Sequence, residues 1–206
     1  MEEKNLIVSN YISKKITKEI IQYDFIDKTQ KAAYEYCFDF VLDLLFYNLS
    51  LLFIGIAFHK PLLSIVYIIT FNPLKMLAEG YHATSRLKCS FLSYSIYVTV
   101  LFLSNKITSV ISNPFLLFFY IMMSALVIAF SPVTPPQHRF SKIERNHLKS
   151  LCLFYSLLLF ILYIVLFLKV QTIYYSCMTL CLMILLICQI IGRIQYNKKG
   201  VESYDS

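Results

Sequence analysis

The chain has 206 residues, of which 58% are hydrophobic and only 15% are charged. Soluble domains carry roughly a quarter charged residues, so this composition excludes an ordinary soluble protein and predicts a multi-pass membrane protein. The net charge of +7 is dispersed among several segments and no recognition motif accompanies it, which argues against nucleic acid as a partner.

Residues 1–36 form a basic arm ahead of the first apolar run. Val8, Ile12, Ile16 and Ile20 recur every four residues among lysines and acids, a spacing typical of an amphipathic helix. Such a helix can lie on the surface of the lipid bilayer, or it can pack against the rest of the protein on the cytoplasmic side. The pattern is compatible with both locations.

Six apolar runs follow within residues 37–191, the predicted transmembrane domain. Two of them, 61–74 and 90–104, are short, and each is either re-entrant or extended into its polar flanks. A spanning helix needs about 20 apolar residues. The four runs that fit this length well are 37–58, 113–131, 151–168 and 172–191.

The distribution of lysine and arginine favours six crossings with both termini in the cytoplasm. Short cytoplasmic loops are enriched in these residues. With six spans, only Lys60, Lys106 and Lys169 of the 19 Lys and Arg fall on the outer side. We therefore predict an all-α membrane protein with six transmembrane helices, an N-terminal amphipathic helix and a basic cytoplasmic tail at residues 192–206.

A proline-rich, basic loop is predicted on the cytoplasmic side at residues 131–150. Pro132, Pro135 and Pro136 favour an extended exit from the preceding span, whereas residues 141–150 can be helical. The basic residues of this loop would attract an acidic substrate. They are Arg139, Lys142, Arg145 and Lys149.

The stretch GYHATSRLKC, residues 80–89, lies between the two short runs and carries the candidate chemistry. Cysteine is a nucleophile as the thiolate, and a thiol with its ordinary pKa of about 8.5 is only a few per cent ionised at pH 7. A nearby histidine raises the thiolate fraction and can protonate a leaving amine. His82 and Cys89 are therefore the candidate catalytic pair. Arg86, Lys88 and a helix beginning at this point would add positive charge beside the thiol.

The spacing of this pair predicts a bend. Seven residues of straight helix would separate His82 from Cys89 by about 10 Å, which is too far for direct proton transfer. Gly80 permits a bend ahead of the histidine, and Asn72-Pro73 is expected to break the preceding helix. We expect a loop that folds His82 back over Cys89. On spacing alone, two packing residues are the competing interpretation.

Asp39 and Asp43 stand one helical turn apart in the first predicted span. A carboxylate near the centre of a membrane helix costs about 2.5 to 3.5 kcal/mol, so both side chains are expected to face the protein interior. One of them orients His82 or contacts substrate, or else the two form structural pairs with Lys75, Arg86 or Lys88.

Three cysteines of the last span, Cys177, Cys181 and Cys188, lie close to one stripe of the helix. No histidine or carboxylate accompanies them, so we interpret them as packing thiols rather than metal ligands. Neither a metal ion nor another cofactor is expected.

The stretch GYHATSRLKC resembles the signature region of the accessory gene regulator B (AgrB) family, membrane cysteine endopeptidases of Gram-positive peptide quorum sensing. Residues 131–151, SPVTPPQHRFSKIERNHLKSL, are similar to a later loop of the same family. They depart from it at residues 137–139, where Gln-His-Arg replaces the Asn-Lys-Pro that the family often has. By position, Gly80 matches the family's glycine, His82 its catalytic histidine and Cys89 its nucleophile.

This resemblance implies a definite reaction. The substrate would be an AgrD-type propeptide with an amphipathic leader, a core containing Cys or Ser, and an acidic C-terminal tail. Cleavage between core and tail would leave a thioester on Cys89, and the core would then close a thiolactone or lactone ring. The resemblance also implies a homodimer in the bacterial cytoplasmic membrane, and the predicted topology puts the active site on the cytoplasmic side. A small non-enzymatic transporter or peptide-export module is the alternative function.

Overall fold

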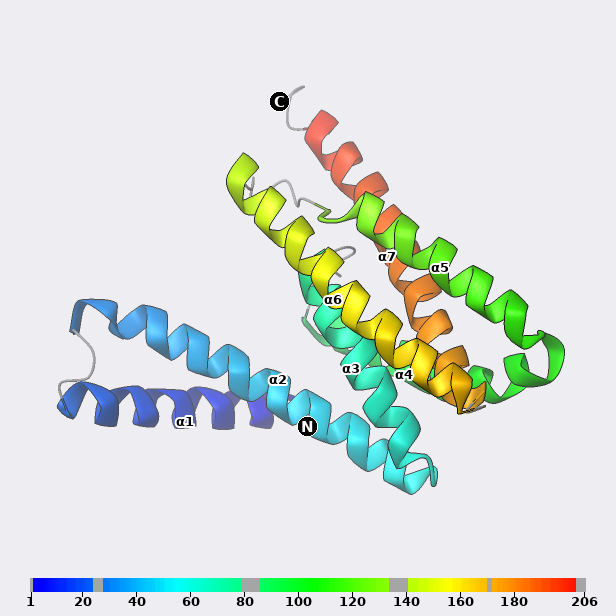
Figure 1. Cartoon of the computed structure of the whole chain (residues 1–206). Helices are drawn as coiled ribbons and strands as arrows, with labels where there is room; N and C mark the ends of the chain where they lie inside the picture. Colours follow the sequence, from blue (N-terminus) through cyan, green and yellow to red (C-terminus); the bar gives the residue numbers. More distant parts are fainter. Residues whose placement is uncertain (1, 24–27, 79–85, 134–140, 170–171, 203–206) are drawn as a thin grey trace. The chain divides into compact units, whose positions relative to one another are not determined.

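The computed structural model describes residues 2–23, 28–78, 86–133, 141–169 and 172–202, and every secondary-structure element in these ranges is a helix. The all-α class predicted from the sequence is thus confirmed. The chain forms two compact units, Met1–Ile56 and Ala57–Ser206. Figure 1 shows the helices in chain order.

The first unit holds three elements: α1 (Glu2–Gln22), the short 3-10 helix η1 (Lys28–Gln30) and α2 (Lys31–Ala57). A helix forms where the four-residue repeat of apolar side chains predicts one. Ile12, Ile16 and Ile20 are half-buried on α1, and Ser13 and Thr17 between them are buried. The covered face of α1 therefore combines isoleucines with small hydroxyl side chains.

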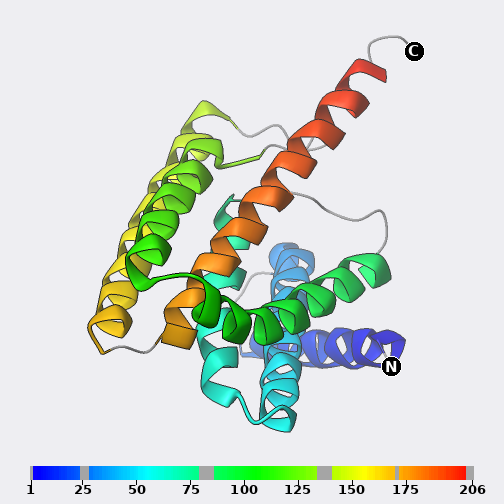
Figure 2. The same cartoon turned by 90° about the vertical axis from the view of Figure 1, so that its right-hand side faces the viewer.

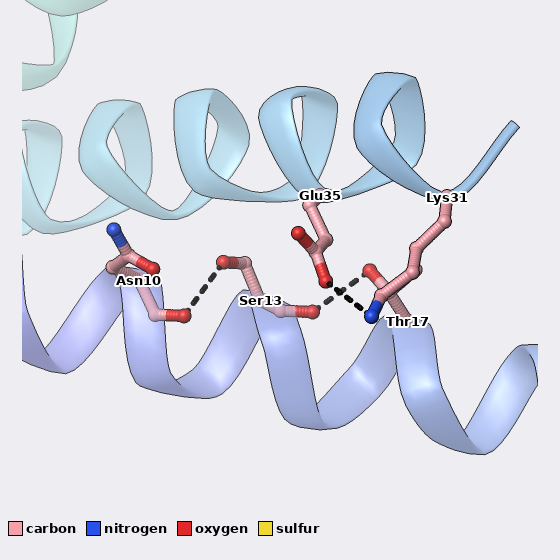
Figure 3. Close-up of polar contacts among 5 residues, drawn as sticks. All are labelled: Asn10, Ser13, Thr17, Lys31 and Glu35. Atoms are coloured by element: carbon pink, nitrogen blue, oxygen red, sulfur yellow. Dashed lines mark hydrogen bonds and ion pairs between the residues drawn. The ribbon is translucent and has the colours of Figure 1, made fainter.

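Small polar side chains occupy the side of α1 that faces α2 (Figure 3). The Ser13 hydroxyl donates to the Asn10 carbonyl at 3.0 Å, and the Thr17 hydroxyl donates to the Ser13 carbonyl at 2.8 Å, so both hydroxyl protons are satisfied within the helix. Lys31 and Glu35 of α2 form an ion pair at 3.8 Å and point toward this face. Small side chains of this kind allow two helices to approach closely.

The second unit is a bundle of five helices: α3 (Pro61–Ala78), α4 (Arg86–Val110), α5 (Asn113–Phe130), α6 (Lys142–Leu168) and α7 (Thr172–Glu202). Its central member is α7, which contacts the other four. Residues 175–182 of α7 are all buried, as expected for a helix surrounded on every side. Figure 2 shows α5 and α6 running alongside each other, and α4 crossing α7 steeply.

The prediction that Asn72-Pro73 breaks the preceding helix is wrong, because α3 continues through Pro73 to Ala78. Proline lacks the N–H that would bond to the carbonyl four residues earlier, which here is that of Ile69. The Tyr155 hydroxyl of α6 donates to this carbonyl at 2.7 Å. A neighbouring helix thus replaces the bond that the proline removes, as is common for proline in membrane helices.

Five helices in the described part of the chain are long and apolar enough to cross a membrane: α2, α3, α5, α6 and α7 from Thr172 to Tyr196. The short run at 61–74 is one of them, because α3 extends into its polar flank. The other short run, at 90–104, lies in α4, which is 25 residues long but is not among the five.

The predicted loop at 131–150 is shorter in the structure, because α6 already begins at Lys142. Its N-terminus carries a capping box, in which the Ser141 hydroxyl accepts from the Glu144 N–H and the Glu144 carboxylate accepts from the Ser141 N–H. The helical, basic character predicted for residues 141–150 is confirmed. This part of α6 continues directly into the apolar run at 151–168.

A buried hydrogen bond joins α3 to α4. The hydroxyls of Ser64 and Tyr97 lie 2.6 Å apart, and the Tyr97 ring packs edge-on against Tyr67 with centroids 5.0 Å apart. Interhelical hydrogen bonds in membrane proteins contribute about 0.6 kcal/mol on average and about 1.7 at most. We expect Tyr97→Phe to lower the free energy of unfolding by about 0.5 to 1.5 kcal/mol, measured as a lower melting temperature in detergent.

Ser64 also donates to the Lys60 carbonyl at 3.1 Å, so the variant does not leave its hydroxyl without an acceptor. Tyr36→Phe is the matched control, because this tyrosine is 72% exposed and should melt like the wild type. A wild-type melting temperature for Tyr97→Phe would show that the bond contributes nothing to stability.

Candidate active site

Cys89, the predicted nucleophile, is the fourth residue of α4 and is half-buried. The sequence predicts that a helix starts close to this cysteine, and α4 does begin at Arg86. Backbone N–H groups in the first turn of a helix have no partner within that helix, and together with the helix dipole they favour negative charge. Cys89 therefore lies at the positive end of the α4 dipole.

Lys75 of α3 reaches toward the same part of α4. Its Nζ atom donates to the Ser93 hydroxyl at 3.4 Å, and Ser93 lies one helical turn after Cys89. The Nζ atom also lies 5.7 Å from the centroid of the Phe71 ring. An ammonium group near a thiol favours its ionisation by charge. Lys75 directly follows the predicted run at 61–74, and the structure places it in the last turn of α3.

A second thiol comes from α7. Cys188 is only 9% exposed, and it lies close enough to both Lys75 and Cys89 for their charges to act on its sulfur. It was predicted to be a packing thiol like Cys177 and Cys181, both of which are buried. Three helices thus bring together four side chains, which we term the thiol cluster: Lys75, Cys89, Ser93 and Cys188.

The end of α3 is tied to the segment that follows α5. The Val133 N–H donates to the Ala78 carbonyl at 3.1 Å, and both residues are buried, as is Ser131. The predicted proline-rich loop therefore starts beside the point where the chain leaves α3 toward the GYHATSRLKC stretch.

Two of the residues that the sequence singles out in this stretch, Gly80 and His82, lie outside the described residues. Arg86 is the first residue of α4, and Lys88 is exposed on it. The bend expected between His82 and Cys89 stays a prediction.

The basic residues predicted to meet an acidic substrate are partly described. Arg139 lies outside the described residues. The other three are exposed on the first turns of α6; they are Lys142, Arg145 and Lys149. The structure therefore keeps their charges accessible at the N-terminus of a spanning helix.

Asp39 and Asp43 lie one turn apart on α2, in the first unit, and both are half-buried. The Oδ1 atom of Asp39 is buried, and within the described residues it has no hydrogen-bond partner. Their predicted roles, in orienting His82, contacting substrate or pairing with basic residues, stay predictions.

Sequence reasoning missed a polar pair in the C-terminal half of α7. Gln189 is buried, and its Nε2 atom donates to the Val127 carbonyl of α5 at 3.3 Å. Arg193, one turn later, donates to the Phe130 carbonyl at 2.7 Å and lies 4.6 Å from the centroid of the Phe130 ring. Gln189 lies inside the apolar run 172–191 and Arg193 follows four positions later, and this spacing was the signal available in the sequence.

No disulfide joins any of the six cysteines, all of which lie in described segments. Over the same segments, no three His, Cys, Asp or Glu side chains gather as the ligands of a metal ion would.

The fold and the thiol cluster define a multi-pass helical membrane protein that has a cysteine in the first turn of a helix and, one turn later, a serine that accepts from a lysine of a neighbouring helix. A family model for accessory gene regulator B (AgrB) matches residues 9–192, and the chain therefore belongs to this family. Membership gives it a role in the accessory gene regulator quorum-sensing system, with an AgrD-type propeptide as its partner. The searches of curated proteins and of solved structures found no match.

Proposed function

We propose that this protein is an integral-membrane cysteine endopeptidase that removes the C-terminal tail of an AgrD-type propeptide and promotes ring closure of the core. The observation that carries the proposal is the position of Cys89, half-buried in the first turn of α4 and one helical turn before Ser93, to which Lys75 of α3 donates. Family membership supplies the substrate class.

In the first step, the Cys89 thiolate attacks the carbonyl carbon that joins core to tail. The carbon–nitrogen bond breaks, and the His82 imidazolium gives its proton to the departing amine. The tail leaves with a new amino terminus, and the core stays on the enzyme as a thioester of Cys89.

In the second step, the core's own thiol loses its proton to His82 and attacks the thioester carbonyl. The bond to Cys89 breaks, its thiolate is regenerated, and the core closes as a thiolactone; a core serine gives a lactone in the same way. Water would compete by hydrolysing the thioester, so the site must exclude it. A half-buried sulfur between packed helices suits this requirement.

Lys75 stabilises the Cys89 thiolate by charge. Replacing it with methionine keeps the length of the side chain and removes the ammonium. We expect cleavage at pH 7 to slow about tenfold to a hundredfold, the change that a rise of about one to two units in the pKa of the thiol would cause. The rate should recover as the pH is raised, because hydroxide then ionises the thiol. Single-turnover cleavage of a synthetic propeptide, measured from pH 6 to pH 9, tests this.

Lys75→Arg, which keeps the charge, should retain most of the rate. Lys169→Met is the matched control, because Lys169 is exposed at the C-terminal end of α6. Equal rates for Lys75→Met and the wild type across the pH range would exclude a role for this ammonium.

The topology that suits this function has six crossings and both termini in the cytoplasm. In this topology α4 also crosses the membrane, which raises the number of crossings from five to six. An even number of crossings keeps both termini on the same side, as the distribution of lysine and arginine requires. The N-terminal helix lies at the cytoplasmic face, and the catalytic pair opens to the same side. The acidic tail of the propeptide meets basic residues there; they are Arg86, Lys88, Arg139, Lys142, Arg145 and Lys149. The enzyme works as a homodimer in the cytoplasmic membrane.

The test is reconstitution of the purified protein in lipid vesicles with a synthetic propeptide. We expect release of the tail, formation of a cyclic core, and a mass increase on the Cys89 peptide equal to the acylated core when the core's own nucleophile is replaced by alanine. Tail release without an adduct on Cys89 would refute the proposed mechanism.

A further inference from the structure

We propose that Arg193 is a positioning residue of this site, which acts through the last turn of α3 to hold Lys75 beside Cys89. This inference rests on the proposed function and adds a residue to the same site. The connection runs from Arg193 to Phe130, along the chain to Val133, and from there to Ala78.

The first contact joins α7 to the C-terminus of α5. Phe130 is the last residue of α5, where carbonyl groups lack partners within the helix and the helix dipole is negative. Arg193 satisfies the Phe130 carbonyl at 2.7 Å and stacks on the ring of the same residue at 4.6 Å. A charged donor strengthens such a bond, and a ring below the guanidinium adds a cation–π contact. Figure 1 shows α5 running along α7 at this end.

The second contact joins the segment after α5 to α3. Residues 131–133 follow Phe130 directly and are buried, so their path depends on where α5 ends. The Val133 N–H then donates to the Ala78 carbonyl, at the end of α3. Fixing Phe130 therefore also fixes a hydrogen-bond partner of the last turn of α3.

This last turn needs external support. The last carbonyls of any helix find no N–H donor within the helix, and in α3 these include the Ala78 carbonyl that accepts from Val133. Lys75 is three residues before Ala78, so it lies one turn back on the same face. A shift of this turn moves the ammonium relative to Ser93 and Cys89. Arg193 thus controls the charge at the thiol without touching it.

The experiment follows the alkylation rate of Cys89 by iodoacetamide against pH, with the Cys89 peptide quantified by mass spectrometry in the full-length protein. At pH 7 we expect Arg193→Gln to slow alkylation about threefold to tenfold. This corresponds to a rise of about half to one unit in the pH midpoint, the pH at which alkylation of Cys89 reaches half of its maximal rate. Arg193→Lys should stay within about twofold of the wild type, because it keeps a charged donor over the Phe130 ring.

Lys60 offers a matched control at the opposite end of α3. Its Nζ donates to the Leu101 carbonyl at 3.0 Å and lies 5.4 Å from the centroid of the Phe102 ring, so it makes the same two kinds of contact as Arg193. Lys60→Gln should leave the pH midpoint of Cys89 unchanged. An equal shift in Lys60→Gln would show that any loss of such a contact disturbs the thiol, and would overturn the proposal.

The path through Lys75 is tested by a double-mutant cycle. If Arg193 acts through Lys75, then Arg193→Gln should cause no further shift in a Lys75→Met background. An additive shift, or an unchanged midpoint in the single Arg193→Gln variant, would refute the proposal. Should Arg193→Gln not be recovered folded, Phe130→Leu removes the ring and keeps the carbonyl, and a smaller shift in the same direction is expected.

The alkylation assay uses no propeptide, so its outcome is separate from that of the proposed function. If the wild type fails to cleave the propeptide while Arg193→Gln still shifts the midpoint, the protease proposal falls and the coupling stands. In the cleavage assay, Arg193→Gln should lower kcat and leave KM within about twofold, because the residue acts on the nucleophile and not on substrate contacts.

Discussion

Replacing Cys89 with alanine is expected to abolish tail release from the propeptide, with a loss of at least about a thousandfold in the single-turnover rate. The reason is that alanine has no group to form the acyl bond on which both steps depend. Cys89→Ser should be as inactive, because a serine hydroxyl is far less acidic than a thiol and is not ionised by the same neighbours. Tail release in lipid vesicles, followed by liquid chromatography and mass spectrometry, measures both variants.

Cys188→Ala is the matched control for this result. Its sulfur lies in the same cluster, on α7, and its charge environment includes Lys75 and Cys89. We expect it to keep the cleavage rate within about threefold, since the proposed chemistry needs only one enzyme thiol. Retained cleavage in Cys89→Ala, or loss of cleavage in Cys188→Ala alone, would show that Cys89 is not the nucleophile.

His82→Ala is expected to cause the second largest loss, about a hundredfold to ten-thousandfold at pH 7, the usual contribution of general acid–base catalysis. The variant should lose both steps, because the same imidazole protonates the departing amine and then accepts the proton of the core thiol. Raising the pH should recover only part of the rate: hydroxide can ionise Cys89, but it cannot donate a proton to the amine.

His147→Ala serves as the control, because His147 is exposed on α6 and has no role in the proposed steps. It should cleave the propeptide at the wild-type rate. If His82→Ala retains more than about a tenth of the wild-type rate, His82 is not the acid–base group of this reaction, and another residue has that role.

Hydrophobic periodicity and length predicted most of the helices. The run at 113–131 became α5, and the run at 151–168 became the apolar part of α6, because an apolar segment of about 20 residues in a membrane satisfies its backbone hydrogen bonds internally as a helix. The N-terminal helix was also predicted, from the isoleucine repeat. These signals are local, since each depends on residues within a few turns of one another.

Predictions that depended on distant contacts were less accurate. Asn72-Pro73 was expected to end a helix, and the helix continues because Tyr155 supplies a donor to the freed Ile69 carbonyl from 86 positions away. The run at 90–104 lies in α4, which crosses α7 steeply (Figure 2) and is not among the five helices that length and apolar composition single out in the described residues, so its crossing of the membrane stays a prediction.

The predictions for the candidate site show the same difference between local and distant signals. The sequence by itself determined the membrane class, the family signature and the place of Cys89 at a helix start, because composition, spacing and helix boundaries are properties of short segments. Only the tertiary structure decided which cations turn inward: Lys75 toward Ser93, and Arg193 onto Phe130. Counting charges treats every lysine and arginine alike, whereas a donor is drawn inward when packing leaves a carbonyl or hydroxyl of another helix within its reach.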